Sequence, residues 1–188
     1  MRTRREQMAS RRRSPSLDYL ESRNLLSGTG SPHSEVARLP HVVPFVATET
    51  LTNRTESPPV NGYSTVTNYT TGKGSPLGDF TAVTTVPNEP NPPPFGVPFD
   101  VTGGTVTFTT AKGSSTLTGT FTSTAIFYTD PTTGDLHVSF TETIKITGGT
   151  GKFAGATGEI EKVGDNDVTA GTGSAEDIGF ISTARSCT

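Results

Sequence analysis

A period of two runs through two neighbouring segments of this chain and limits what they can form. In residues 117–127, every second side chain is apolar or small, and threonines take most positions between them. Residues 136–146 repeat the pattern, with apolar side chains on one face except at position 142. Successive side chains of a strand point to opposite faces, so each segment is predicted to be a strand with one buried face. The loop between them contains Pro131 and Gly134, which predicts a β-hairpin.

Composition extends this prediction to most of the chain. The 188 residues include 35 Thr, 21 Gly and 14 Pro and no Trp, a balance that favours strands and turns. Six further strands are expected, at residues 42–50, 63–71, 79–86, 104–110, 159–163 and 178–184. Eight short strands in succession suit an all-β fold, a closed antiparallel up-and-down β-barrel without exposed sheet edges. Residues 87–98 carry six prolines and are expected to leave the ladder.

Charge divides the chain into a basic tail and an acidic body. Residues 1–23 contain seven arginines and three carboxylates, whereas residues 24–188 have a net charge of −7. Ser14 and Pro15 suit the start of a helix and Gly28 suits its end, which predicts a short amphipathic helix over residues 15–27. We therefore expect residues 1–41 to form a tail, helix and linker, and residues 42–188 to form the barrel domain.

The order of residues in the tail indicates where in the cell the protein is located. Arg11, Arg12 and Arg13 precede residues 16–27, which read SLDYLESRNLLS. This resembles the N-terminal motif of many planctomycete exported proteins, a basic cluster followed by Leu-Glu-x-Leu-Glu-x-Arg-x-Leu-Leu-Ser, with Asp18 where that family usually has Glu. The resemblance implies an extracytoplasmic location, secreted or in the cell envelope. The alternative is a solvated basic helix, or one that contacts nucleic acid or anionic lipid.

Three segments of the body carry a second resemblance. Residues 78–81 (GDFT), 116–121 (TLTGTF) and 146–158 (ITGGTGKFAGATG) resemble bacterial proteins of the allene oxide cyclase and dirigent barrel group. In that group a strand ends in Gly-Gly-Thr-Gly, a short turn buries an aromatic and a small residue, and the next strand begins. The resemblance covers about residues 42–185 and implies an eight-stranded antiparallel barrel. It carries no catalytic residue over to a position in this chain.

The glycine-rich segment also fits a weak dinucleotide-binding pattern, with Ala154 in the third glycine position. A strand expected near Glu159 leaves no room for the helix that such a site needs, and Phe153 stands where a Walker motif needs Ser or Thr. We therefore expect no cofactor. Phe153 and Ala154 are expected to plug one end of the barrel, on a structural turn formed by Gly148, Gly149, Gly151, Gly155 and Gly158.

A metal site has little support in the sequence. Asp165, Asp167, Thr169 and Glu176 match four positions of a calcium loop, but Ala170 replaces the required glycine and no helices flank the segment. These residues are a weak calcium candidate, and a solvated polar connection is the preferred interpretation. The single cysteine, Cys187, excludes a site built from several cysteines.

Glu142 is the most informative residue, because counting by twos places its carboxylate on the inward face of the barrel. A β-bulge or a satisfied structural carboxylate is preferred over a catalytic acid or ligand anchor. If the barrel holds a cavity, the candidate lining residues are Glu142, Phe121, Phe127, Phe140 and Phe153. A barrel filled by these phenylalanines would exclude a ligand.

Several functions are disfavoured. Residues 74–188 contain five Lys and Arg against twelve carboxylates, which opposes nucleic-acid binding. No catalytic residue is assigned, because His137 is alone in the body and no nucleophile motif is present. No apolar run approaches the roughly 20 residues of a transmembrane helix. The preferred hypothesis is a non-enzymatic exported or envelope-associated barrel. The alternative is a small apolar-ligand binder or a cyclase-like enzyme that uses the barrel cavity, and a homo-oligomer remains open.

Overall fold

The computed structural model describes residues 40–61, 63–88 and 94–183. The chain divides into two units, Met1–Ala37 and Arg38–Thr188, and the described residues all belong to the second. The predicted helix at residues 15–27, the export-like motif and Cys187 lie outside the described residues. Within the described part of the chain, no helix is both long and apolar enough to cross a membrane.

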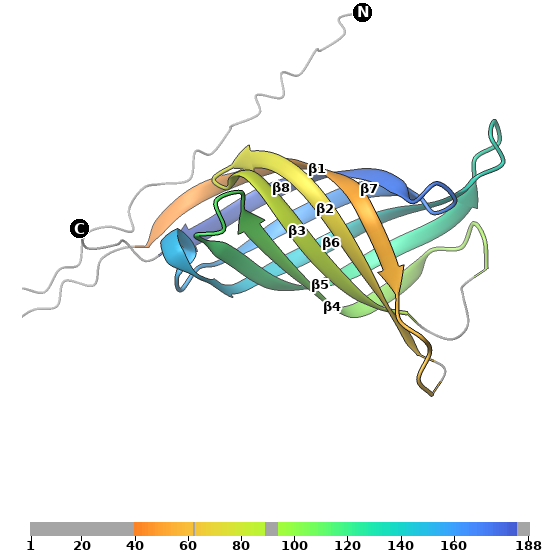
Figure 1. The fold of residues 1–188 in the computed structure, drawn as a ribbon, viewed down its shortest axis with the longest axis horizontal. Helices are drawn as coiled ribbons and strands as arrows, with labels where there is room; N and C mark the ends of the chain where they lie inside the picture. The colour runs from red at the N-terminus through yellow and green to blue at the C-terminus, as the bar shows by residue number, and fades with distance from the viewer. Residues whose placement is uncertain (1–39, 62, 89–93, 184–188) are drawn as a thin grey trace, which may run out of the picture. The chain divides into compact units, whose positions relative to one another are not determined.

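Eight strands form a closed barrel in sequence order (Figure 1). Each strand pairs antiparallel with the next, and the last pairs with the first. This confirms the predicted eight-stranded up-and-down β-barrel. The strands are β1 (His41–Glu56), β2 (Ser64–Ser75), β3 (Gly78–Asn88), β4 (Phe99–Thr110), β5 (Thr116–Thr129), β6 (Leu136–Gly149), β7 (Thr157–Asp167) and β8 (Thr172–Thr183).

The strands extend further than predicted, and one expectation is wrong. Pro87 belongs to β3 and lies opposite Thr65 of β2, although residues 87–98 were expected to leave the ladder. Pairing between β3 and β4 ends at Thr85, so from there β3 pairs with β2 alone and tolerates a residue without an N–H. Strand β7 likewise continues past Val163 to Asp167.

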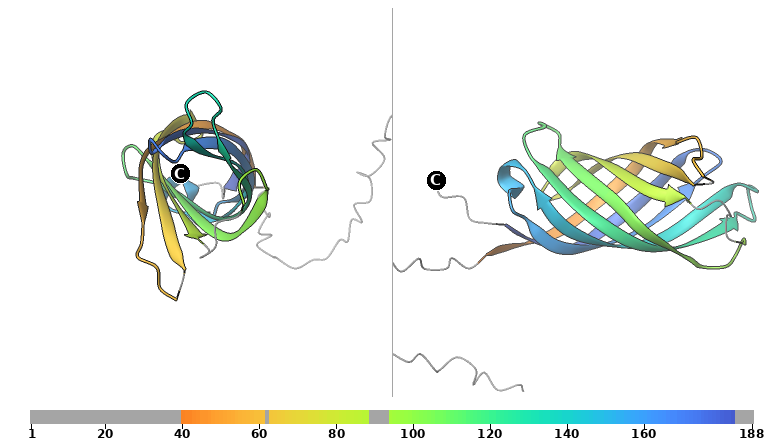
Figure 2. Two further views of the ribbon diagram at one scale, coloured as in Figure 1. Left: turned by 90° about the vertical axis from the view of Figure 1, so that its right-hand side faces the viewer. Right: turned by 90° about the horizontal axis from the view of Figure 1, so that it is seen from below.

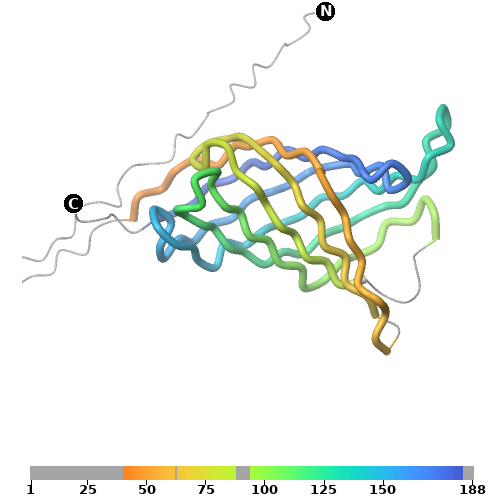
Figure 3. Tube along the Cα trace, viewed as in Figure 1, coloured from red at the N-terminus to blue at the C-terminus, as the bar shows by residue number. Residues whose placement is uncertain are grey.

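The two ends of the barrel differ (Figures 1 and 2). At one end, which we call the η1 end, the short 3-10 helix η1 (Gly151–Phe153) lies near the β2–β3 and β4–β5 turns. The opposite end, the hairpin end, holds the β1–β2, β5–β6 and β7–β8 turns. The predicted β5–β6 hairpin is confirmed: Gly134 has a φ of 81°, and its N–H donates to the Asp130 carbonyl over 2.8 Å. Figure 3 shows the strands crossing the barrel obliquely between these ends.

The apolar core fills the η1 half of the barrel. The Phe153 ring is 2% exposed and packs in the core. Ala154 is exposed, contrary to expectation, and Ala156 takes the buried position because the 3-10 turn ends before it. Gly151 has a φ of 57°, and a Cβ there would lie 2.3 Å from Ser115 Oγ. The core comprises Phe45, Ala47, Leu77, Phe80, Ala82, Val106, Phe108, Leu117, Phe121, Ile144, Ile146, Phe153, Ala156, Ile160 and Ile181.

The other four glycines of the predicted turn take different backbone roles. Gly155 and Gly158 have positive φ angles of 68° and 152°. Gly149 is needed for space, because a Cβ there would lie 2.3 Å from the Thr116 carbonyl oxygen. Gly148 has open space for a side chain, because a Cβ there would lie 3.7 Å from its nearest neighbour, Thr118 Oγ1. The close backbone approach at this end therefore depends on particular glycines of the segment rather than on all of them.

Candidate functional site

The inward face of the barrel changes from apolar to polar partway along the strands. On β1, buried Phe45 and Ala47 are followed by buried Glu49. On β7, Ile160 is followed by Lys162, which is 3% exposed. The polar positions lie on the hairpin side of the apolar core, because β1 and β7 both run from the η1 end to the hairpin end. The barrel interior therefore has an apolar half and a polar half.

Four ionisable side chains, which we call the interior charge cluster, lie in the polar half. They are Glu49 of β1, Glu142 of β6, Lys162 of β7 and Asp177 of β8, and all four are buried. Strand register brings three of them into one row: Glu142 lies opposite Lys162, and Lys162 lies opposite Asp177. Paired residues of adjacent strands project to the same face, so all three side chains enter the barrel.

Lys162 is the cation of this cluster. Its Nζ lies 2.8 Å from Glu49 Oε1 and 3.7 Å from Asp177 Oδ1. Glu49 Oε2 also accepts a hydrogen bond of 2.6 Å from Thr70 Oγ1. Burial opposes the charge on Lys162, but the three carboxylates, Glu49 first, outweigh it and raise the pKa of Lys162. The Lys162 ammonium therefore stays protonated, and its closest ion pair is with Glu49.

The three carboxyl groups differ in their pKa values. Burial raises the pKa of Glu49, but the Lys162 ammonium and the hydrogen bond from Thr70 contribute to outweighing it, so the net shift is downward. Burial raises the pKa of Asp177 to about 8, and the neighbouring Glu49 carboxylate adds to the rise against the opposing effect of Lys162. Ionised Asp177 finds no hydrogen-bond donor for either oxygen, whereas protonated Asp177 can donate to Glu49. Near neutral pH, Glu49 therefore carries the negative charge and Asp177 holds a proton.

The carboxyl group of Glu142 is only partly compensated by its neighbours. Its side chain points into the barrel, as the period-two pattern predicted, and the residue is 6% exposed. Its Oε2 atom has no hydrogen-bond partner. Burial raises the pKa of Glu142 to about 7, and the attraction of Lys162 only partly offsets it. Strand β6 pairs with both neighbours without a register shift at this residue, so the bulge expected there is absent.

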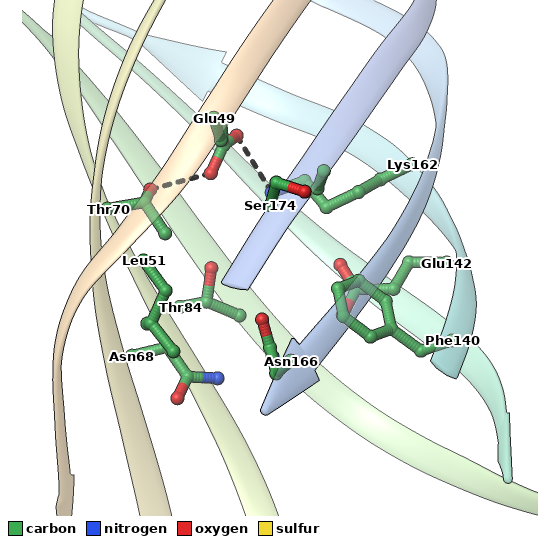
Figure 4. A pocket seen from close by; sticks show the side chains of 11 residues that line it. Glu49, Leu51, Asn68, Thr70, Thr84, Phe140, Glu142, Lys162, Asn166 and Ser174 are labelled. Atoms are coloured by element: carbon green, nitrogen blue, oxygen red, sulfur yellow. Dashed lines mark hydrogen bonds and ion pairs between the residues drawn. The ribbon is translucent and has the colours of Figure 1, made fainter. Parts of the chain in front are cut away.

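A pocket opens beside the interior charge cluster (Figure 4). It has a volume of about 350 Å³ including space open to solvent, with room for only one or two waters or a small polar group. The lining combines charged, polar and apolar side chains: Glu49, Leu51, Asn68, Thr70, Thr84, Phe140, Glu142, Lys162, Asn166, Ser174 and Ala175.

Two of the five predicted cavity residues line this pocket, namely Phe140 and Glu142. Phe121 and Phe153 lie in the apolar core instead. Phe127 stacks on Phe99, with ring centroids 5.4 Å apart and planes at 11°. The barrel is long enough for inward phenylalanines to lie in different layers, and of the four predicted phenylalanines only Phe140 lines the pocket.

Sequence reasoning missed Glu49, Lys162 and Asp177. A signal for each was present, because the period of two that places Glu142 inside also applies to its neighbours. Glu49 follows Phe45 and Ala47 at intervals of two, and Lys162 follows Ile160. Their mutual contacts depend on strand register, which the sequence pattern alone does not supply.

The weak calcium candidates lie on the outer face of the barrel. Asp165 and Asp167 belong to β7 rather than to a loop, and both contact His137. Asp165 Oδ1 lies 2.7 Å from His137 Nδ1, and its Oδ2 accepts a 2.9 Å hydrogen bond from the Tyr128 hydroxyl. The hydrogen bond to Asp165 raises the pKa of both His137 and Tyr128. Glu176 lies on β8 opposite Val163.

No group of three or more His, Cys, Asp or Glu side chains in residues 40–61, 63–88 and 94–183 is arranged to hold a metal ion. Asp165 accepts a hydrogen bond from the Tyr128 hydroxyl, and Asp167 Oδ1 accepts one of 2.8 Å from the Ala170 backbone N–H. The described residues thus give the calcium hypothesis no geometric support.

Comparison with known proteins adds one structural similarity. No protein-family model and no curated protein matches the sequence. Among solved structures, the pterocarpan synthase dirigent protein GePTS1 is similar, with a TM-score of 0.49 and 14% sequence identity, over 86% of this chain and 100% of that chain. The barrel architecture itself is established by the strand pairing described above.

Proposed function

We propose that this β-barrel binds a small molecule in the pocket of its polar half. The ligand places a polar end with hydrogen-bond donors against Glu142, and an apolar body against Leu51, Phe140 and Ala175. The observation that carries this proposal is the unpartnered Oε2 atom of a carboxyl group that is 6% exposed and lines an open pocket. This is the ligand-binding alternative of the sequence analysis, with a polar end added to the expected apolar ligand.

The energetics of the polar half support a binding role. A buried polar atom without a partner costs about 1–3 kcal/mol. An eight-stranded barrel has an interior that side chains can fill or that can hold one small ligand. Side chains fill the η1 half, which has a packed apolar core. The hairpin half has retained buried charges and open space, which add nothing to a barrel that is only a structural module.

Pocket size limits the ligand. The pocket has room for only one or two water-sized atoms, and the space open to solvent accommodates the rest of the molecule. Ser174 is exposed, and Asn68, Asn166 and Ala175 are half-buried, so the pocket reaches solvent on their side. A compact molecule with one polar end therefore fits best. The pocket supports binding, and no catalytic step is assigned to it.

A blocking variant tests this function. We expect 2-phenylethanol, added to the full chain, to shift the backbone amide NMR signals of pocket residues such as Asn68 and Phe140. Ala175→Leu fills the pocket and should weaken the effect at least tenfold. Thr141→Leu on the outer face of β6 is the matched control and should leave it unchanged. Shifts that are absent, or that are equal in both variants, would refute pocket binding.

We also propose that the protein is located outside the cytoplasm, on the basis of the N-terminal motif. Residues 1–41, fused to a reporter in a planctomycete host, should direct it out of the cytoplasm. Replacing Arg11, Arg12 and Arg13 with alanine supplies the control for the basic cluster. A reporter that stays wholly cytoplasmic with the unaltered tail would remove this proposal.

A further inference from the structure

The charges around the pocket do not balance. Three buried carboxyl groups, Glu49, Glu142 and Asp177, surround one buried ammonium, that of Lys162. Lys162 makes its close ion pair with Glu49, at 2.8 Å, and Asp177 lies at 3.7 Å. Glu142 pairs with Lys162 in the strand register, yet its Oε2 has no partner and lines the pocket. With Asp177 protonated and Glu49 paired with Lys162, ionised Glu142 is the carboxylate left without a cation, and it lines the pocket that a ligand can reach.

Resting on the proposed function, we infer that the polar end of the ligand is a primary ammonium group with Glu142 as its counter-ion. Such a group brings both the missing positive charge and three N–H donors, whereas a hydroxyl brings one donor and no charge. It is a single heavy atom of about the size of a water molecule, so it fits a pocket that has room for one or two waters. Phe140 lies two residues from Glu142 on the same face of β6 and lines the same pocket (Figure 4). Its ring offers the cation an aromatic neighbour.

Other charged groups fit less well. An anion would add to the negative charge that Glu49 already carries and would face Glu142. A divalent metal ion needs several oxygen ligands, and the described residues contain no group of three or more His, Cys, Asp or Glu side chains arranged for one. Lys162 also occupies the centre of the cluster and would repel a second charge of +2. A monovalent organic cation at the edge of the cluster avoids both problems.

Protonation supports the same choice. The pKa of Glu142 is about 7 and that of Asp177 about 8, so protons replace the missing cation near neutral pH. The charged groups that face Glu142 are Glu49 on β1, Lys162 on β7 and Asp177 on β8. An ammonium ligand displaces the proton of Glu142, at little cost at pH 7. Its affinity should therefore rise from pH 6 to pH 8, while that of an alcohol stays level.

Three probes of similar size test this inference by calorimetry on the full chain. They are 2-phenylethylamine, 2-phenylethanol and phenylacetate, which share a phenyl ring and differ in the polar end. At pH 8 the amine should bind at least tenfold more tightly than the alcohol, and phenylacetate should bind most weakly. Equal binding of amine and alcohol would overturn the ammonium assignment and leave the proposed function standing. Failure of every probe to bind would count against the proposed function itself.

Glu142→Gln tests the counter-ion. This near-isosteric change should lower the affinity for the amine about tenfold and leave the alcohol unaffected. Glu161→Gln removes the same charge from an exposed position on β7 and is the matched control, expected to change neither. Equal losses for amine and alcohol in Glu142→Gln would overturn the assignment.

Proton release gives a readout on the unaltered protein. Amine binding at pH 7 in two buffers of different ionisation heat should release about half a proton per ligand, and alcohol binding none. Calcium or potassium chloride at matched ionic strength should not compete with the amine. Two outcomes would contradict an organic ammonium ligand paired with Glu142. One is that either metal ion displaces the amine at a concentration below the one at which the amine itself binds. The other is that the amine binds without releasing a proton.

Discussion

The two halves of the barrel interior are built from the same strands but differ in the side chains that fill them. In the η1 half, inward positions carry Phe, Leu, Ile, Val and Ala, and the core is closed by Phe153. In the hairpin half, the same faces carry the interior charge cluster and a pocket. Packed apolar side chains stabilise a fold, whereas buried charges retain their cost unless partners satisfy them. We conclude that the η1 half supplies stability, and that the hairpin half keeps buried charges at a cost in stability.

Removing the Lys162 cation of the hairpin half should lower the free energy of unfolding more than any other change. Lys162→Met leaves three buried carboxyl groups without their cation, and loss of one member of a buried ion pair costs up to about 5 kcal/mol. Chemical denaturation at pH 8 should show a loss of this order. At pH 5 the loss should be smaller, because Glu142 and Asp177 are protonated there.

Lys145→Met is the matched control for this prediction, since Lys145 is exposed on the outer face of β6. Its effect should stay within about 0.5 kcal/mol. If Lys162→Met loses no more unfolding free energy than Lys145→Met, the buried carboxyl groups do not depend on Lys162. The proposed difference in stability between the two halves would then be wrong.

The corresponding change in the η1 half should act through volume alone. Phe153→Ala removes a ring that is 2% exposed and leaves a cavity, at a cost of about 4 kcal/mol. This cost should be the same at pH 5 and pH 8, because the core around Phe153 is apolar. Denaturant titrations at both pH values check this.

Phe95→Ala is its control, because Phe95 is 64% exposed and should contribute little. A Phe153→Ala cost that changes with pH as the Lys162→Met cost does would show that the two halves are coupled. Unchanged stability in Phe153→Ala would exclude the plug role for this residue.

The sequence predicted the apolar half better than the polar half, and the reason is physical. The period of two identifies a buried face, and hydrophobic side chains on it need no particular partner, so Leu117 and Ile144 could be placed in the core before any register was known. Buried charges are different, because their roles depend on which strands lie opposite. Lys162 is separated from Glu49 by more than a hundred residues, and only closure of β8 on β1 brings the two together.

Pocket residues show the same limit. Phe140 and Glu142 were predicted as cavity residues because they share a face of one strand. Phe121 and Phe127 were grouped with them, yet the register places Phe121 beside Ile144 and Phe127 beside Val138, in other layers. A pattern along one strand gives the face that a residue occupies and leaves its height among the other strands undetermined.

A third change sharpens the contrast through pH. The folded-state pKa of Glu142 is about 7, above the ordinary value of 4.5, so the folded protein holds a proton that the unfolded chain releases. Its contribution to stability is complete below about pH 4.5 and is lost as pH rises through 7. The glutamine of Glu142→Gln cannot ionise. The free energy of unfolding of this variant should therefore exceed that of the unaltered protein by about 3 kcal/mol at pH 8 and by little at pH 4.5.

Unfolding free energies of Glu142→Gln measured from pH 4.5 to pH 8.5 check this sign, and Glu161→Gln again supplies the exposed control. Asp177, with a pKa of about 8, should keep some pH dependence in both variants. A Glu142→Gln variant that is less stable than the unaltered protein at pH 8 would mean that the ionised carboxylate is satisfied, and the pocket would lose its unpaired group.

The smallest effect is expected at the surface of the η1 end. Lys152 is exposed; its Nζ donates a 2.7 Å hydrogen bond to the Pro76 carbonyl and lies 4.9 Å from the centroid of the Phe153 ring. Exposed contacts of this kind contribute about 0.5 kcal/mol, so Lys152→Ala should lower stability by about that amount. Thermal melts should show this small loss, with and without ATP. If Lys152 instead belonged to a phosphate-binding loop, ATP would stabilise the unaltered protein and Lys152→Ala would abolish the effect. An unchanged melting temperature on adding ATP, together with a large loss in Phe153→Ala, would leave packing as the role of this segment.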